Sequence, residues 1–149
     1  MSQNVNFYVS LKVIIKNKKG EILCLKIADR YSMAGFYDMP GGRISEDEIQ
    51  EPYSKIIQRE LEEEIGKKVK YKLCLKPVSV ARHIYFSKSL QREAYIFMIF
   101  FEARYISGDI IISSEHKRYR WIKLNRNNIK KLFVRGLLEG MENYLVLNS

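Results

Sequence analysis

The chain has 149 residues, of which 46% are hydrophobic and 29% are charged, and its formal net charge is +9. These proportions are close to those of an average soluble protein, and the length suffices for one domain, residues 1–149, with a real hydrophobic core. The first six residues lack the basic and apolar segments of a secretion signal, and no stretch approaches the length that spans a membrane. We therefore expect a cytoplasmic protein.

Several apolar segments predict a β-sheet. Lys16 to Gly20 has the composition of a hairpin turn, and Ala94 to Ala103 is almost continuously apolar, as expected of a central strand covered on both faces. The predicted strands are Tyr8 to Ile15, Glu21 to Ile27, Ala94 to Ala103, Ile110 to Ile112 and Tyr119 to Ile122, and a closing helix is predicted from Asn127 to Tyr144. Helices on both sides of a mixed sheet would give an α/β fold, a three-layer α/β/α sandwich.

The two cysteines, Cys24 and Cys74, lie in apolar, strand-like segments without a CxxC motif or a Cys/His cluster. Reduced thiols buried in the core are therefore expected, rather than a disulfide or a metal site.

A helix is predicted between Pro52 and Gly66, which are typical residues for the start and the end of a helix. Within it, Glu60 to Glu64 holds four carboxylates in five positions. An isolated acidic run is most often a solvated helix face, where a pair of like charges costs only about 0.2–0.5 kcal/mol. Burial would raise this cost, because two like charges about 6 Å apart repel by roughly 2–3 kcal/mol at an effective dielectric constant near 20.

Three of these carboxylates converge. At about 100° per residue, Glu60, Glu63 and Glu64 fall within a sector roughly 100° wide, while Glu62 points away from it. The apolar stripe of the same helix lies beside this sector, so the acids border the core. The stripe consists of Ile57, Leu61 and Ile65. Oxygen ligands at such a boundary suit hard divalent cations, Mg²⁺ or Mn²⁺ when phosphates share the coordination sphere.

Arg59 to Gly66 matches the core of the Nudix box, Arg-Glu-apolar-x-Glu-Glu-x-Gly, at every fixed position. Glu51 lies eight residues before Arg59, the distance at which the box carries its earlier glutamate. Upstream, Gly35 to Ile44 is similar to the strand and turn that enter the box, with an aromatic residue, Asp, an apolar residue and Pro-Gly-Gly. The chain therefore resembles a Nudix hydrolase, and the resemblance implies the same α/β/α sandwich.

The sequence departs from the family's box in two places. Gly42 and Glu51 are separated by eight residues, where the family normally has five, so the loop is three residues longer. Glu48 would satisfy the usual count, but Glu51 is preferred because it has the right distance to the box arginine and sits at the helix start, where a carboxylate meets free N–H groups. Lys67 stands where the family usually has an apolar residue, and Val69 is expected to replace its packing.

The resemblance implies hydrolysis of a pyrophosphate bond in a nucleoside diphosphate joined to another group, with Mg²⁺ as cofactor and Mn²⁺ as a substitute. The substrate could be a nucleoside triphosphate, a dinucleoside polyphosphate, ADP-ribose or a nucleotide sugar. The residues that match metal ligands are Glu60, Glu63 and Glu64, of which Glu63 also counts as catalytic, with a backbone carbonyl near Gly41 and Gly42. Arg59 and Glu51 match the charged pair that orients the ligand helix.

The general base is harder to predict. Ser113 to Ile122 resembles the late family segment in which a loop glutamate precedes an Arg-Trp strand, and Glu115 is the matching residue. Glu115 could deprotonate water or bind another cation, or it could be an ordinary loop residue. Glu93 and Glu102 are weaker alternatives, and for His116 a surface or capping role is expected rather than contact with substrate.

Candidate substrate-binding residues are single aromatic or basic side chains. Those that could stack on a base are Phe36, Tyr37, Tyr85 and Phe86, and those that could hold phosphates are Arg43, Arg82 and His83. Aromatic residues in strands are more often core, and lone basic residues are as often plain surface, so these alternatives stay open.

The positive charges are scattered and are not interleaved with aromatic residues as in a stacking platform for nucleic acid. They fit a solvated surface or the steering of a small polyanion better than binding of RNA or DNA. An RNA 5′-end pyrophosphohydrolase and a non-catalytic nucleotide-binding Nudix module remain alternatives. No membrane partner is expected, and the formation of a homodimer stays open.

Overall fold

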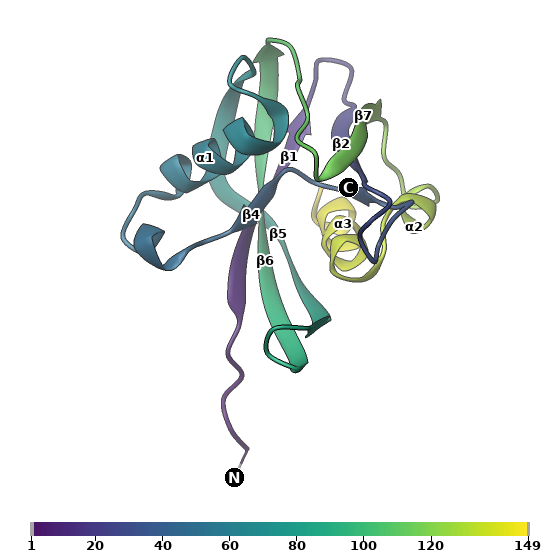
Figure 1. The fold of residues 1–149 in the computed structure, drawn as a ribbon. Helices are drawn as coiled ribbons and strands as arrows, with labels where there is room; N and C mark the ends of the chain where they lie inside the picture. Colours follow the sequence, from purple (N-terminus) through teal and green to yellow (C-terminus); the bar gives the residue numbers. More distant parts are fainter. Residues whose placement is uncertain (1, 149) are drawn as a thin grey trace.

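The computed structural model describes residues 2–148 and shows, over that range, a seven-stranded mixed sheet between two layers of helix (Figure 1). In chain order the elements are β1 (Tyr8–Lys16), β2 (Ile22–Ile27), β3 (Tyr37–Asp38), β4 (Gly41–Arg43), a 3₁₀ helix η1 (Glu46–Glu48), α1 (Tyr53–Ile65), β5 (Lys70–Ser87), β6 (Arg92–Ser107), β7 (His116–Ile122), α2 (Ile129–Leu132) and α3 (Arg135–Leu147). The strand order is β3-β2-β1-β6-β5, with β4 paired to β1 and β7 paired to β2. Only β1 and β6 run parallel among these pairs. The predicted α/β/α sandwich is confirmed.

The sheet divides the core into two apolar clusters, because successive side chains of a strand point to opposite faces. In β1, Leu11, Val13 and Ile15 join the cluster under α1, whereas Ile14 joins the cluster under α2 and α3. One charged residue interrupts the buried, mostly apolar part of this strand. Lys12 is also buried, on the face of Ile14, and its charge must be balanced there.

Helix α1 agrees closely with the sequence prediction. Ile57, Leu61 and Ile65 are at most 1% exposed, so the predicted stripe is the buried side of the helix. The helix is capped by Gly66, whose φ of 93° is a backbone conformation that residues other than glycine rarely adopt. Val69, expected to replace the packing of the missing apolar residue, is buried in the same cluster.

The predicted strand at Ile110 to Ile112 is wrong. This segment is irregular and fastens itself to the end of α1, because the N–H of Ile111 donates to the carbonyl of Ile65 and the N–H of Ser113 donates to that of Glu64. Its alternating apolar residues pack beside the helix instead of pairing with a strand. The consequence is functional, since the same contact brings the start of β7 next to Glu64.

The predicted closing helix is split into α2 and α3. Phe133 and Val134 are extended, and Arg135 has a φ of 55° at the start of α3. The break turns the chain so that both helices cover the same face of the sheet, with Ile129 and Phe133 still buried in the cluster beneath them. Apolar spacing alone did not reveal it, since both helices keep their buried residues on one side.

Of the two cysteines, Cys24 is buried as expected, but Cys74 is exposed, so the expectation of a core thiol is wrong there. Both are free thiols. Cys74 lies on β5, the strand at the edge of the sheet, where one side of the strand is left uncovered. Within residues 2–148, no helix is long and apolar enough to cross a membrane.

Candidate active site

The turn from β3 to β4 lies against the last turns of α1. The N–H of Gly41 donates to Oε1 of Glu64 at 3.1 Å. Gly41 has a φ of 125°, and a Cβ there would overlap the carbonyl of Leu11. At Gly42 a Cβ would overlap the carboxylate of Glu60. Gly41 therefore lets this turn pack closely on β1, and Gly42 lets its backbone approach the carboxylate of Glu60.

The three predicted ligand carboxylates differ in burial. Glu60 and Glu64 are 9% and 6% exposed, whereas the side chain of Glu63 is 60% exposed. Burial raises the pKa of Glu60, and it raises the pKa of Glu64 to about 8, since desolvation penalises the charged form. The Oε2 atom of Glu64 is buried without a hydrogen-bond partner among the described residues. A buried carboxylate with a free oxygen is suited to a cation, so the site fits a divalent metal.

Arg59 holds these acids in place, but its main partner is Glu48 and not the predicted Glu51. Its Nε and Nη2 bind the carboxylate of Glu48, with Nη2 2.6 Å from Oε1, and its Nη2 lies 2.8 Å from Oε1 of Glu60. Nη1 lies 3.3 Å from Oε1 of Glu63. The hydrogen bonds from Arg59 lower the pKa of Glu48 to about 2. Glu51 pairs with Lys55 on the surface of the helix at 3.9 Å.

The extra three residues of the box therefore lie after Glu48, between η1 and α1. From Gly42 to Glu48 the family's usual spacing is kept. A capping box at Ser45 stabilises η1, because the hydroxyl and the N–H of Ser45 both donate to Oε1 of Glu48. The five-residue count from Gly42 was the signal that identified the correct glutamate, and the distance to Arg59 was misleading because the insertion lies within it.

Lys12 was missed by the sequence analysis. Its Nζ donates to Oδ1 of Asp38 at 3.1 Å and to the carbonyls of Met39 and Gly41, each at 3.3 Å. Burial alone would lower the pKa of Lys12, but the carboxylates of Asp38 and Glu64 outweigh it, so the pKa lies above its usual value. The ammonium group ties β1 to the turn that carries the glycines. A charged residue inside an otherwise apolar strand was the signal available.

Asp38 and His116 were also missed as site residues. The side chain of His116 is only 4% exposed, so the expected surface role is wrong. Its Nε2 lies 3.4 Å from Oδ2 of Asp38 and its Nδ1 lies 3.9 Å from Oε2 of Glu64. One ligand atom from each of these three residues lies within 4.8 Å of the others. The start of β7 and the end of β3 thus meet at Glu64.

The candidate bases have different surroundings. Glu115 is exposed next to the buried His116, and its carbonyl accepts a hydrogen bond from the N–H of Ala28. Glu102 accepts a hydrogen bond from the hydroxyl of Tyr144 on α3 and lies 3.7 Å from the ammonium of Lys16. Glu93 is exposed near the start of β6. None of the three side chains has a described contact with the carboxylates of α1.

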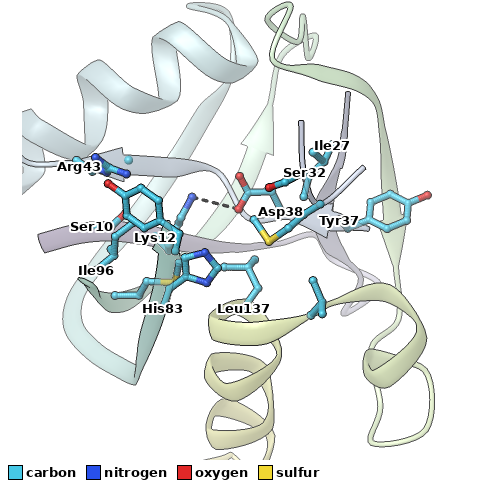
Figure 2. A pocket seen from close by; sticks show the side chains of 15 residues that line it. Ser10, Lys12, Ile27, Ser32, Tyr37, Asp38, Arg43, His83, Ile96 and Leu137 are labelled. Atoms are coloured by element: carbon cyan, nitrogen blue, oxygen red, sulfur yellow. Dashed lines mark hydrogen bonds and ion pairs between the residues drawn. The ribbon is translucent and has the colours of Figure 1, made fainter. Parts of the chain in front are cut away.

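A cavity of about 310 Å³ opens beside this cluster, between the sheet and α3 (Figure 2). Lys12 and Asp38 lie on its inner wall, with Gly42 and Arg43 on the side of the box. Most of the other lining residues are apolar or aromatic. They include Ile27, Met33, Tyr85, Ile96, Met98 and Leu137. A mostly apolar cavity with a few polar groups is the usual form of a small-molecule site.

Of the predicted substrate-binding residues, Arg43 lies at this cavity. Its guanidinium is 5.1 Å from the ring centroid of Tyr8 and 5.0 Å from that of Tyr85, so two rings hold it in position. His83, Tyr37 and Tyr85 also line the cavity. Arg82 is engaged by Glu139 at 3.7 Å, and neither Arg82 nor Phe36 is a lining residue.

The comparisons agree with this geometry. The NUDIX domain family matches residues 7–137, so the chain belongs to the Nudix hydrolase family. The MutT protein from Methanosarcina mazei Go1 is 23% identical, with 99% of this chain and 96% of that one covered and a TM-score of 0.69. The E. coli ORF135 protein is 19% identical, with 97% and 93% covered and a TM-score of 0.70. The NUDIX domain of Shewanella oneidensis NrtR, solved with ADP ribose, is 9% identical, with 93% and 84% covered and a TM-score of 0.61.

At these identities the solved structures show a common fold and no more. A search of curated proteins finds no match to the chain.

Proposed function

We propose that the protein hydrolyses a pyrophosphate bond in a nucleoside diphosphate joined to another group, with the help of a divalent cation. The observation that carries the proposal is the buried pair Glu60 and Glu64, held against Gly41 and Gly42 at the edge of a cavity. Two partly desolvated carboxylates side by side repel each other, and a cation removes that repulsion.

Mg²⁺ is the cofactor we propose, with Mn²⁺ as a substitute, bound by Glu60, Glu63 and Glu64. When bound, the cation supplies charge neutralisation on the phosphate oxygens and a lowered pKa for the attacking water. Arg59 contacts both Glu60 and Glu63, so it orients two of the proposed ligands. Gly42, which has no Cβ, leaves room for the Glu60 carboxylate and for a substrate phosphate to approach.

The substrate would place its phosphates at the cluster and its remaining group in the cavity. Arg43 is proposed to bind a phosphate, because its guanidinium is fixed at the cavity by Tyr8 and Tyr85 and offers planar donors to an anion. The apolar and aromatic lining would hold a base or a sugar. ADP ribose, the ligand in the NrtR domain structure, is one candidate of this type.

Glu115 remains our proposal for the general base. It is exposed to water and adjoins His116, which lies within the cluster. Its carbonyl is anchored by the N–H of Ala28, which limits the freedom of the loop that carries it. We also propose that residues 1–149 act as a single domain in the cytoplasm.

A turnover screen with Mg²⁺ tests this function. The substrates are deoxynucleoside triphosphates, ADP-ribose, nucleotide sugars, dinucleoside polyphosphates and a short 5′-triphosphorylated RNA, with products identified by mass. We expect cleavage of one free nucleotide class, abolished by chelator and by Glu64→Gln. Preference for the RNA would favour 5′-end processing instead. Nucleotide binding without turnover of any substrate would favour the non-catalytic module.

A further inference from the structure

His116 is held beside α1 by backbone hydrogen bonds. The N–H of Ser113 donates to the carbonyl of Glu64 at 3.1 Å, and the N–H of His116 donates to the carbonyl of Ser113 at 3.2 Å. From His116 onward the chain pairs with β2. The imidazole is therefore fixed against Glu64 by the sheet on one side and by the helix end on the other.

The hydrogen bond to Asp38 determines which ring nitrogen carries a proton. The ammonium of Lys12 donates to Oδ1 of Asp38 at 3.1 Å, and an adjacent ammonium favours the carboxylate form of this side chain. A carboxylate only accepts hydrogen bonds, so Nε2 of His116, 3.4 Å away, is the donor. The lone pair through which a histidine binds a cation is then on Nδ1, on the other side of the ring.

That lone pair faces another acceptor. Nδ1 of His116 and Oε2 of Glu64 are 3.9 Å apart, and both atoms are buried without a hydrogen-bond partner among residues 2–148. The residues themselves are only 7% and 6% exposed. The separation is too long for a hydrogen bond. It does suit two ligands of a single cation, because ligands about 2.1 Å from an ion lie roughly 3–4 Å from each other.

The surroundings also have the form of a metal site. A histidine ligand commonly donates its second N–H to a carboxylate, which fixes the ring and raises its basicity. Asp38 occupies this position toward His116 and is itself held by the ammonium of Lys12 at 3.1 Å. An imidazole ligand disfavours Mg²⁺, which is bound through oxygen ligands and keeps several of its waters. Transition cations accept nitrogen ligands more readily, and among them Mn²⁺ also takes the carboxylate ligands present here.

We propose that Glu64 Oε2 and His116 Nδ1 form a cation position that selects Mn²⁺ over Mg²⁺, with Asp38 orienting the imidazole. Water or substrate phosphate oxygens complete the coordination. This inference rests on the proposed function only in that Glu64 serves both, and binding of Mn²⁺ is measurable without substrate or turnover.

The test is pulsed electron paramagnetic resonance of Mn²⁺ bound to the full-length, tag-free protein without substrate. A coordinated imidazole gives ¹⁴N modulation of the Mn²⁺ echo. The chain has only two histidines, so His83 is the one other imidazole in it. We expect ¹⁴N modulation in the wild type, its loss in His116→Gln and its retention in His83→Gln. The preference for Mn²⁺ over Mg²⁺ should fall on the order of 10-fold in His116→Gln.

Two outcomes overturn the proposal: bound Mn²⁺ without ¹⁴N modulation in the wild type, or unchanged modulation in His116→Gln. The wild-type measurement decides even if that variant does not fold. Glu63→Gln separates the two proposals, because it should lose turnover and keep the ¹⁴N modulation. Modulation in a protein that turns over no substrate would contradict the proposed function alone.

Discussion

The two edges of α1 carry the same residue type in different surroundings. Glu60 and Glu64 form the inner edge, where their side chains are 11% and 7% exposed, while the side chain of Glu63 on the outer edge is 60% exposed. The pKa of Glu64 is raised to about 8 by burial. A run of like residues therefore becomes a candidate metal site through the position of the helix on the core, since burial makes the charge costly and a cation favourable.

The largest effect is expected on turnover, when a proposed cation ligand on either edge, Glu63 or Glu64, is replaced. Glu63→Gln and Glu64→Gln should each reduce turnover by at least about 100-fold, because each loses a ligand charge and keeps its shape. They should differ in stability: with chelator and above pH 8, where Glu64 is ionised, Glu64→Gln should raise Tm because it removes a buried charge, and Glu63→Gln should not. The measurements are kcat at saturating Mg²⁺ and thermal melts. Glu62→Gln serves as the control, and normal turnover in either ligand variant contradicts the prediction.

The next effect concerns the loop that meets the inner edge. If Glu115 is the base, Glu115→Gln should lower kcat by about 100-fold and change KM little, because a base acts in the transition state. The acidic limb of the pH–rate profile should disappear or shift. Glu93→Gln is the matched control and should keep that limb. Near-normal kcat with an unaltered limb in Glu115→Gln would leave Glu115 as a loop residue.

The third prediction concerns Arg59, which connects the two edges. Arg59→Lys keeps the charge but loses the planar fork that binds Glu48, so the affinity for Mg²⁺ should fall about 10-fold or more while the fold persists. Glu48→Gln should also lower the affinity for Mg²⁺. Glu51→Gln is the control, because the carboxylate of Glu51 pairs with Lys55 on the surface of the helix. The effect is measured by titrating activity against Mg²⁺. If Arg59→Lys responds to Mg²⁺ as the wild type does, Arg59 does not orient the metal ligands.

The inner and outer edges also differ in how far the sequence could predict them. Helix α1, its buried stripe and the convergence of Glu60, Glu63 and Glu64 follow from the 3.6-residue period, which is a local property. The partner of Arg59 was predicted wrongly because the two spacings in the sequence, from Gly42 and from Arg59, pointed to different glutamates. The fold of η1, capped at Ser45, shows that the insertion lies between Glu48 and Arg59.

The contacts of Lys12, Asp38 and His116 depend on the register of the sheet. The hydrogen bond between His116 and Asp38 joins residues 78 positions apart, and that between Lys12 and Asp38 joins residues 26 positions apart. A shift of one residue in a strand would turn each side chain to the other face. Such contacts become visible only once the strands are paired, so the inner wall of the site could not be derived from local patterns.

The smallest effect is expected in the stability of the metal-free protein as a function of pH. Glu64 has its folded pKa raised to about 8, against about 4.3 in an unfolded chain, so the native state binds the extra proton between these values. Stability in chelator should therefore be greatest below the unfolded pKa and fall as pH rises toward 8. Glu48, with a pKa of about 2, has the opposite sign: its stabilisation is present above its unfolded pKa and is lost as pH falls toward 2.

Urea denaturation from pH 2 to 9 measures both dependences of stability on pH. Glu64→Gln should remove the loss of stability above pH 5, and Glu48→Gln should remove the loss of stability below pH 5. Parallel stability curves for Glu64→Gln and the wild type would mean that burial does not control the charge of Glu64.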